Sequence, residues 1–270
     1  CLARASVEKD SGWFGRYLPQ SLVLSDPGAR DAALHAIQAC IPHARVLPVG
    51  VDSVEFGPHR PGAFQRIHAR ELSQSGGVLV YDLEIATPDG QVVERWSRLE
   101  LRVIDAARAP SAWSAALLGP YLQRRVGETL NRAVGVEING AAPDLYRADG
   151  KPLTANGHIS RTHISGLTLQ VRAQVPVGCD CEPVVAKTPA DWRGLLGSGG
   201  FALAELLSAE RDEDLQRSAT RVWCAIECVK KAGLRADARI DLADSAGATD
   251  HDWIVLGSGT AKIATTVVKL

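Results

Sequence analysis

The stretch DPGARDAALHAIQACIP, residues 26–42, decides the first fold because it has the features of one complete helix. Pro27 stands where a helix begins, apolar residues recur at helical spacing, and Pro42 closes the segment. Four short runs with strand-like alternation follow, separated by turns rich in glycine and proline. They cover residues 45–56, 63–72, 76–87 and 91–104. A helix followed by four strands predicts an antiparallel sheet wrapped around that helix.

The pattern changes after a linker-like segment at residues 105–113. Amphipathic helices are predicted at 114–134 and 217–234, and the run 158–184 is predicted to form two or three strands. Three closing strands are predicted at 238–244, 252–259 and 261–270. We therefore expect an α+β chain with two domains, residues 1–107 and 108–270.

Composition narrows the classes of function. The net charge of −1 provides no basic field for nucleic acid, and no window approaches the ~18 apolar residues that a membrane span needs. Six cysteines in 270 residues do not make a disulfide framework, so we expect a reducing, cytoplasmic setting. The sequence contains no methionine, not even at position 1, so we expect it to be either a fragment of a longer chain or a trimmed form of the protein.

The run VPVGCDCEPV, residues 175–184, places two carboxylates in an apolar setting. On a strand, Asp180 and Glu182 would share one exposed face while Cys179 and Cys181 point inward. Two close carboxylates repel each other unless a cation lies between them, and Mg²⁺ prefers such oxygen ligands. The alternative is a solvated strand edge.

The predicted helix at 217–234 supplies a third carboxylate. Glu227 and Lys231 are four residues apart and therefore lie on one helix face. They would make an ordinary surface ion pair if no site is present. A zinc site is a further alternative, but neither cysteine spacing is usual for zinc, and small buried side chains are favoured. The cysteines concerned are Cys179, Cys181, Cys224 and Cys228.

Residues 108–270 resemble a 4′-phosphopantetheinyl transferase of the type that activates peptide and polyketide synthases. Five motifs in the family's order support the resemblance. They are LLGPYLQRRV at 117–126, DGKPLT at 149–154, ISRTHISG at 159–166, Gly178-x-Asp180-x-Glu182, and Trp223 with Glu227 and Lys231.

The resemblance implies Mg²⁺-dependent transfer of the phosphopantetheine arm from coenzyme A to a serine of an acyl carrier protein domain. By the resemblance, Glu227 takes the proton of the serine hydroxyl, and Lys231 neutralises or protonates the leaving phosphate. Lys151 and His163 would contact the nucleotide phosphates. The implied Mg²⁺ ligands are Asp180, Glu182 and Glu227.

The sequence departs from that family at several points. Ile226 stands where the family has a lysine, Thr162 replaces a serine, and the first half of the transferase is shortened. These departures leave open a non-catalytic module that only docks carrier domains.

The first domain resembles the second half of a polyketide synthase dehydratase, a double hot-dog fold. Asp31 and His35 match the family's D-x-x-x-H helix pattern, and residues 47–56 match the strand after it. The partner histidine motif of the other half is not found, so we expect half of an active site that is inactive alone, with the rest upstream. The alternatives are a dehydratase fragment and a plain surface pair. The two resemblances together suggest the C-terminal end of an iterative, enediyne-type polyketide synthase, which makes an antibiotic precursor.

Overall fold

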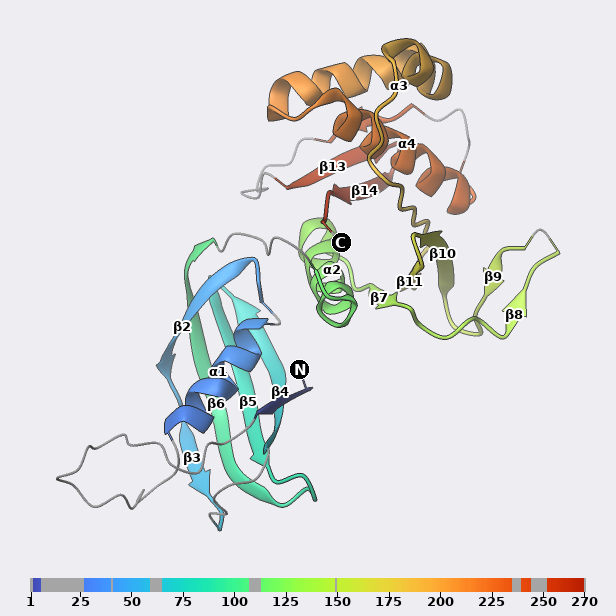
Figure 1. Cartoon of the computed structure of the whole chain (residues 1–270). Coiled ribbons are helices and arrows are strands. Elements are labelled where there is room, and N and C mark those ends of the chain that lie inside the picture. Colours follow the sequence, from blue (N-terminus) through green and yellow to red (C-terminus); the bar gives the residue numbers. More distant parts are fainter. Residues whose placement is uncertain are drawn as a thin grey trace. The chain divides into compact units, whose positions relative to one another are not determined.

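The computed structural model describes residues 2–5, 27–39, 41–58, 65–106, 113–148, 150–234, 239–243 and 252–269. The chain divides into two compact units, Cys1–Pro110 and Ser111–Leu270 (Figure 1). The domain boundary predicted from the sequence, after residue 107, lies three residues before this division. Among the described helices, none combines the length and the apolar character that crossing a membrane requires.

The described residues of the first unit form one helix and one antiparallel sheet. The sheet order is β1-β4-β5-β6-β2, and the short β3 also pairs with β6. Figure 1 shows α1 lying along the curled sheet, as predicted for a hot-dog fold. The elements are β1 (Leu2–Ala5), α1 (Pro27–Ala39), β2 (Ala44–Gly50), β3 (Ser53–Phe56), β4 (Gln65–Ser75), β5 (Val78–Ala86) and β6 (Val92–Ala106).

Alternation along the strands builds the core of this unit. Leu83 and Ile85 of β5 and Leu99 of β6 are each 1% exposed. They pack against α1, where Ala33 and Ile37, one helical turn apart, are fully buried. Each large apolar side chain buried in this way contributes roughly 1.5–3 kcal/mol. The core therefore fixes which face of α1 meets the sheet.

A buried carboxylate also ties α1 to the sheet. Glu94 of β6 is 3% exposed and accepts hydrogen bonds from Arg30 Nε at 3.1 Å and from Trp96 Nε1 at 2.8 Å. The Arg30 guanidinium lies 4.9 Å above the ring of Phe56 in β3. A buried charge needs such a partner, so Arg30 positions the first turn of α1.

In the part of the second unit that the structure describes there are three helices and two small three-stranded antiparallel sheets. The sheets have the orders β10-β11-β7 and β12-β13-β14, and β8 and β9 form a separate ribbon. The elements are α2 (Ala115–Leu130), β7 (Gly135–Ile138), β8 (Leu145–Tyr146), β9 (Pro152–Leu153), β10 (His158–Ile164), β11 (Leu167–Ala173), α3 (Pro189–Arg211), α4 (Leu215–Lys231), β12 (Asp241–Leu242), β13 (Trp253–Ser258) and β14 (Ala261–Thr266).

Helix α4 lies at the centre of the second unit. Its residues Ala219, Val222 and Ala225 are fully buried and pack with Leu207 of α3 and Leu256 of β13. The spacing of three residues puts these α4 side chains on one face. The opposite, more polar part of α4 is thereby free to carry charged side chains.

Helix α3 was not predicted from the sequence. Thr188 and Asp191 form a capping box at its start, which satisfies the first backbone N–H groups. The helix bends at Gly197, whose φ of 69° is one that glycine adopts without strain.

The strand predicted through Asp180 is wrong. Strand β11 ends at Ala173, and residues 174–188 form an irregular segment that we call the acidic loop. Pro176 and Pro183 lie in this loop, and proline has no N–H to donate to a sheet ladder. The side chains of the loop therefore do not follow the alternation expected of a strand.

Candidate active site

The acidic loop is fixed between strand β10 and the end of helix α4. Ser160 Oγ of β10 accepts a hydrogen bond from the backbone N–H of Cys179 at 3.0 Å. A Cβ at Gly178 would lie only 1.9 Å from the carbonyl oxygen of Cys228. The loop backbone thus touches the backbone of α4, and only glycine permits this approach.

Asp180 lies at the point where these three segments meet. Its side chain is 4% exposed. Oδ1 accepts hydrogen bonds from Lys231 Nζ at 2.6 Å and from Thr162 Oγ1 at 3.2 Å. Oδ2 is buried and has no hydrogen-bond partner. The Cys224 thiol also interacts with this carboxylate, because burial first, and then the charge and hydrogen bond of Asp180, raise the pKa of Cys224.

Lys231 completes this arrangement from the last turn of α4. Its ammonium also donates to the carbonyl oxygen of Cys179 at 3.2 Å. Burial works to lower the pKa of Lys231, but the hydrogen bond and charge of Asp180 outweigh burial, and the net pKa is raised. Lys231 is therefore a cation at neutral pH.

The other two predicted carboxylates are in different surroundings. Glu227 Oε1 lies 2.7 Å from the Nζ atom of its neighbour Lys230, which also lies over the Trp223 ring at 5.5 Å. Glu182 is exposed on the acidic loop. Asp180 and Glu182 therefore do not share one exposed face, and that expectation is wrong because the loop is not a strand.

The side chains in this arrangement do not form a magnesium site. Among the residues that the structure describes, no group of three or more His, Cys, Asp or Glu side chains is placed to hold a metal ion. The donors are oxygens of the kind that Mg²⁺ prefers, and Asp180 Oδ2 lacks a partner, but Glu182 and Glu227 are not gathered around it. Their role as Mg²⁺ ligands stays a prediction.

The cysteines around this site are free thiols. Burial raises the pKa of Cys179 to about 11 and also raises that of Cys228. Metal ligands and nucleophiles are thiolates, so these groups act as small buried side chains. Cys181 and Cys224 have raised pKa values for the same reason. Cys1 and Cys40 lie outside the described residues.

Lys151 and His163, the two predicted nucleotide contacts, do not lie among the residues that hydrogen-bond to Asp180. Lys151 lies beside the β8–β9 turn, where its carbonyl oxygen accepts from the Arg147 N–H at 2.8 Å. His163 is exposed on β10, and its Nδ1 lies 2.9 Å from Thr168 Oγ1. Neighbouring residues of a strand face opposite sides, so Thr162 points to Asp180 and His163 points away. The nucleotide contacts remain predictions.

Asp31 and His35 lie side by side on an exposed face of α1. Asp31 Oδ2 and His35 Nδ1 are 3.2 Å apart, and the side chains are 70% and 72% exposed. The first unit alone therefore does not enclose them, and their catalytic role stays a prediction.

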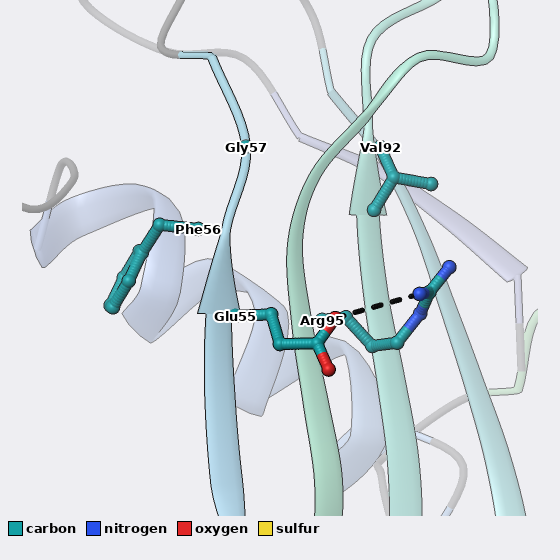
Figure 2. Close-up of a pocket in the computed structure, with 5 residues that line it drawn as sticks. All are labelled: Glu55, Phe56, Gly57, Val92 and Arg95. Carbon is teal, nitrogen blue, oxygen red and sulfur yellow. Dashed lines mark ion pairs between the residues drawn. The ribbon is translucent and has the colours of Figure 1, made fainter.

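A shallow pocket in the first unit contains none of the predicted site residues. Glu55, Phe56 and Gly57 of the β3 region line it together with Val92 and Arg95 of β6. Figure 2 shows Glu55 and Arg95 turned toward each other, and their charged atoms are 3.6 Å apart. The two charged side chains that line this pocket are therefore paired with each other.

Sequence reasoning missed the roles of Ser160, Thr162 and Lys230. The first two are hydroxyl side chains two residues apart on one face of β10, and both are buried. That S-x-T spacing was visible in the sequence and is the pattern that could have found them.

Comparison with known proteins supports the predicted resemblance of the first unit to a dehydratase domain. Residues 2–111 match the family model described as the polyketide synthase dehydratase N-terminal domain. The match spans less than half of the 270 residues. The description names the N-terminal domain, whereas the helix pattern predicts the second half of a dehydratase. No curated protein is matched.

Several solved structures show a weak likeness. A hypothetical thioesterase protein with coenzyme A from Streptococcus pneumoniae is 13% identical, with 31% of this chain and 66% of that chain covered and a TM-score of 0.26. A thioesterase from Haemophilus influenzae is 14% identical, with 38% and 71% covered and a TM-score of 0.27. AziG from S. sahachiroi is 16% identical, with 38% and 82% covered and a TM-score of 0.27. The family match shows that the first unit is similar to a polyketide synthase dehydratase domain.

Proposed function

We propose that this chain is part of a polyketide synthase in which a dehydratase-type hot-dog unit precedes a 4′-phosphopantetheinyl transferase unit. The transferase unit moves the phosphopantetheine arm of coenzyme A to a serine of an acyl carrier protein domain. The observation that carries this proposal is the convergence on Asp180. Strand β10, the acidic loop and helix α4 each supply a residue there, and these segments hold three of the motifs found in the sequence.

The reaction sets clear demands on the site. The serine oxygen attacks the β-phosphorus of coenzyme A and loses its proton, and the bond from that phosphorus to 3′,5′-ADP breaks. Such a transfer needs positioning and cationic charge rather than covalent help from the protein. Glu227 is the proposed base, since its side chain is 25% exposed and a hydroxyl can reach it. Lys231 is the proposed cation for the leaving phosphate.

The test is transfer followed by intact mass. The full chain is incubated with coenzyme A, Mg²⁺ and an apo carrier domain, and a gain of one phosphopantetheine on the carrier is expected. Glu227→Gln should lower the rate by about 10²- to 10⁴-fold, the usual contribution of a positioned base. Glu205→Gln, at an exposed position of α3, is the matched control and should transfer normally. If the wild-type chain transfers nothing to several carriers, the docking-module alternative is favoured.

A second candidate function belongs to the first unit. Its match to a dehydratase domain favours removal of water from a carrier-bound 3-hydroxyacyl chain, with Asp31 and His35 facing a second hot-dog unit. Because this pair is exposed, we expect no dehydration of a 3-hydroxyacyl thioester by this chain alone. Measurable dehydration that survives Asp31→Asn would contradict the role given to this helix.

A further inference from the structure

The chain contains three asparagines, and two of them, Asn139 and Asn156, are followed directly by glycine. In an Asn-Gly step the backbone nitrogen of the glycine can approach the side-chain amide carbon of the asparagine, because glycine has no Cβ in the way. In an unfolded chain the two steps offer the same chemistry. The folded structure places them in different surroundings.

The glycine of the second step is required by the backbone. Gly157 has a φ of 89°, a conformation that other residues adopt only with strain, and a Cβ there would overlap the carbonyl oxygen of Ala173. The chain therefore needs glycine after Asn156 in order to lead into β10. The reactive Asn-Gly step comes with that turn.

The first step is restrained by the neighbouring strand. Asn139 Oδ1 accepts a hydrogen bond from the backbone N–H of Thr168 in β11 at 2.9 Å, and the Asn139 N–H donates to the Thr168 carbonyl oxygen at 2.8 Å. These two bonds fix the side-chain amide toward β11. The amide must leave this position before its carbon can meet the Gly140 nitrogen.

The second step has no such restraint. Asn156 is exposed in the turn between β9 and β10, and Ala155 and Gly157 on either side of it are exposed as well. None of the residues that the structure describes forms a hydrogen bond with the Asn156 side chain. The amide is therefore able to rotate, and solvent reaches both reacting groups.

We propose that Asn156 is a site of spontaneous deamidation and that the fold protects Asn139 from the same reaction. The Gly157 nitrogen loses its proton and bonds to Cγ of Asn156, while the bond from Cγ to Nδ2 breaks and ammonia leaves. Water then opens the cyclic imide at either carbonyl, which gives aspartate or isoaspartate. No atom is oxidised or reduced, and water is the only co-reactant. This inference does not depend on the proposed function.

The product changes the turn that leads into β10. One negative charge is gained, and isoaspartate adds one atom to the backbone two residues before His158, which pairs with Ala173 at the start of the β10–β11 ladder. Further along the same strand, Ser160 and Thr162 bond to the acidic loop. The modification therefore falls next to the strand that supports the Asp180 arrangement.

The test follows both steps in one sample of the purified full chain. The protein is incubated at mildly alkaline pH in water enriched in heavy oxygen, digested in ordinary water, and analysed by peptide mass spectrometry. The heavy oxygen separates conversion during incubation from conversion during digestion. We expect Asn156 to convert roughly tenfold to a hundredfold faster than Asn139, the scale of two net hydrogen bonds.

Two controls isolate the effect of the fold. The same chain unfolded in urea is the matched reference, because both steps lose their surroundings there and should convert at similar rates. Asn156→Gln is the control variant, since the longer side chain forms the cyclic imide much less readily. Its peptide should stay unmodified, and the rate at Asn139 should equal that of the wild type.

Each result decides the proposal. Faster conversion at Asn156 in the folded chain, with the difference lost in urea, supports it. Equal rates at the two asparagines in the folded chain overturn it, and so does a folded chain whose Asn156 stays intact while the urea sample converts. The same difference in urea as in the folded chain also overturns it, because the flanking sequence would then be the cause.

Discussion

Replacing Gly178 by alanine tests the packing of the acidic loop directly. The added Cβ would lie 1.9 Å from the oxygen and 2.8 Å from the carbon of the Cys228 carbonyl, and 3.0 Å from the Ala232 nitrogen. All three are backbone atoms of the end of α4, so no flexible side chain can move aside. A normal contact needs about 3.5 Å. The loop must therefore shift by more than an ångström, or α4 must lose its last turn.

The shift would break the bonds that hold the loop. Those at risk are the Cys179 N–H to Ser160 Oγ bond at 3.0 Å and the two bonds of Lys231, to Cys179 and Asp180. Each net hydrogen bond contributes roughly 1 kcal/mol, and one to a charged group roughly 1.5–3 kcal/mol. With partial relaxation, we expect Gly178→Ala to lower the free energy of unfolding of the second unit by about 2–4 kcal/mol. The corresponding fall in Tm is roughly 4–16 °C.

Hydrogen exchange read by mass spectrometry on α4 peptides is the suitable assay, because it reports on the second unit alone. Gly194→Ala is the matched control. Gly194 lies in α3, an added Cβ there meets nothing within 4 Å, and alanine in a helix is favoured by up to about 1 kcal/mol. A loss below about 0.5 kcal/mol in Gly178→Ala would refute the close approach of the loop to α4, since changes of that size are typical of neutral surface positions.

Two further predictions concern charges outside the site. Arg30→Met should destabilise the first unit by about 3–5 kcal/mol in urea denaturation, because it leaves the buried carboxylate of Glu94 without its cation. Arg70→Met, which removes one partner of an exposed ion pair, is the control and should cost less than about 1 kcal/mol. Equal losses in the two variants would contradict the difference between the buried and the exposed pair. The hydrogen bonds from Thr188 lower the pKa of Asp191 at the start of α3. Because this pKa is lower in the folded state than in the unfolded state, the ionised carboxylate stabilises the fold at pH values above the ordinary Asp pKa of ~3.9. This stabilisation is lost as the pH falls through the pKa of the folded state. Asp191→Asn should therefore have a lower Tm than wild type at neutral pH, with the difference shrinking in acid; a constant difference would exclude a role for the charge.

The first unit was predictable because its signals are local. Proline marks the start of α1, and the alternation in β4, β5 and β6 is regular enough to place each strand. Helix α3 was missed for an equally local reason. Its sequence contains Gly194, Gly197, Gly199 and Gly200, which weaken a helical pattern, and the helix is stabilised by burial of residues such as Trp192 and Leu207. Tertiary packing overrides propensity there.

The sequence singled out Asp180, Glu227 and Lys231, but it did not predict which side chains each of them contacts. Spacing put Glu227 and Lys231 on one helix face, yet Lys231 bonds to Asp180 and Glu227 pairs with Lys230. A pair three residues apart on a helix is about as favourable as one four apart, so spacing alone could not choose. The choice depends on burial. The Asp180 side chain is 4% exposed and the Glu227 side chain is 25% exposed. The surroundings of Asp180 therefore have the lower dielectric constant, and its carboxylate attracts a cation more strongly. That burial arises from Gly178, which lets the loop backbone touch α4, and from the prolines that end the strand before it. The glycine of the motif therefore sets the electrostatics of the aspartate two residues later.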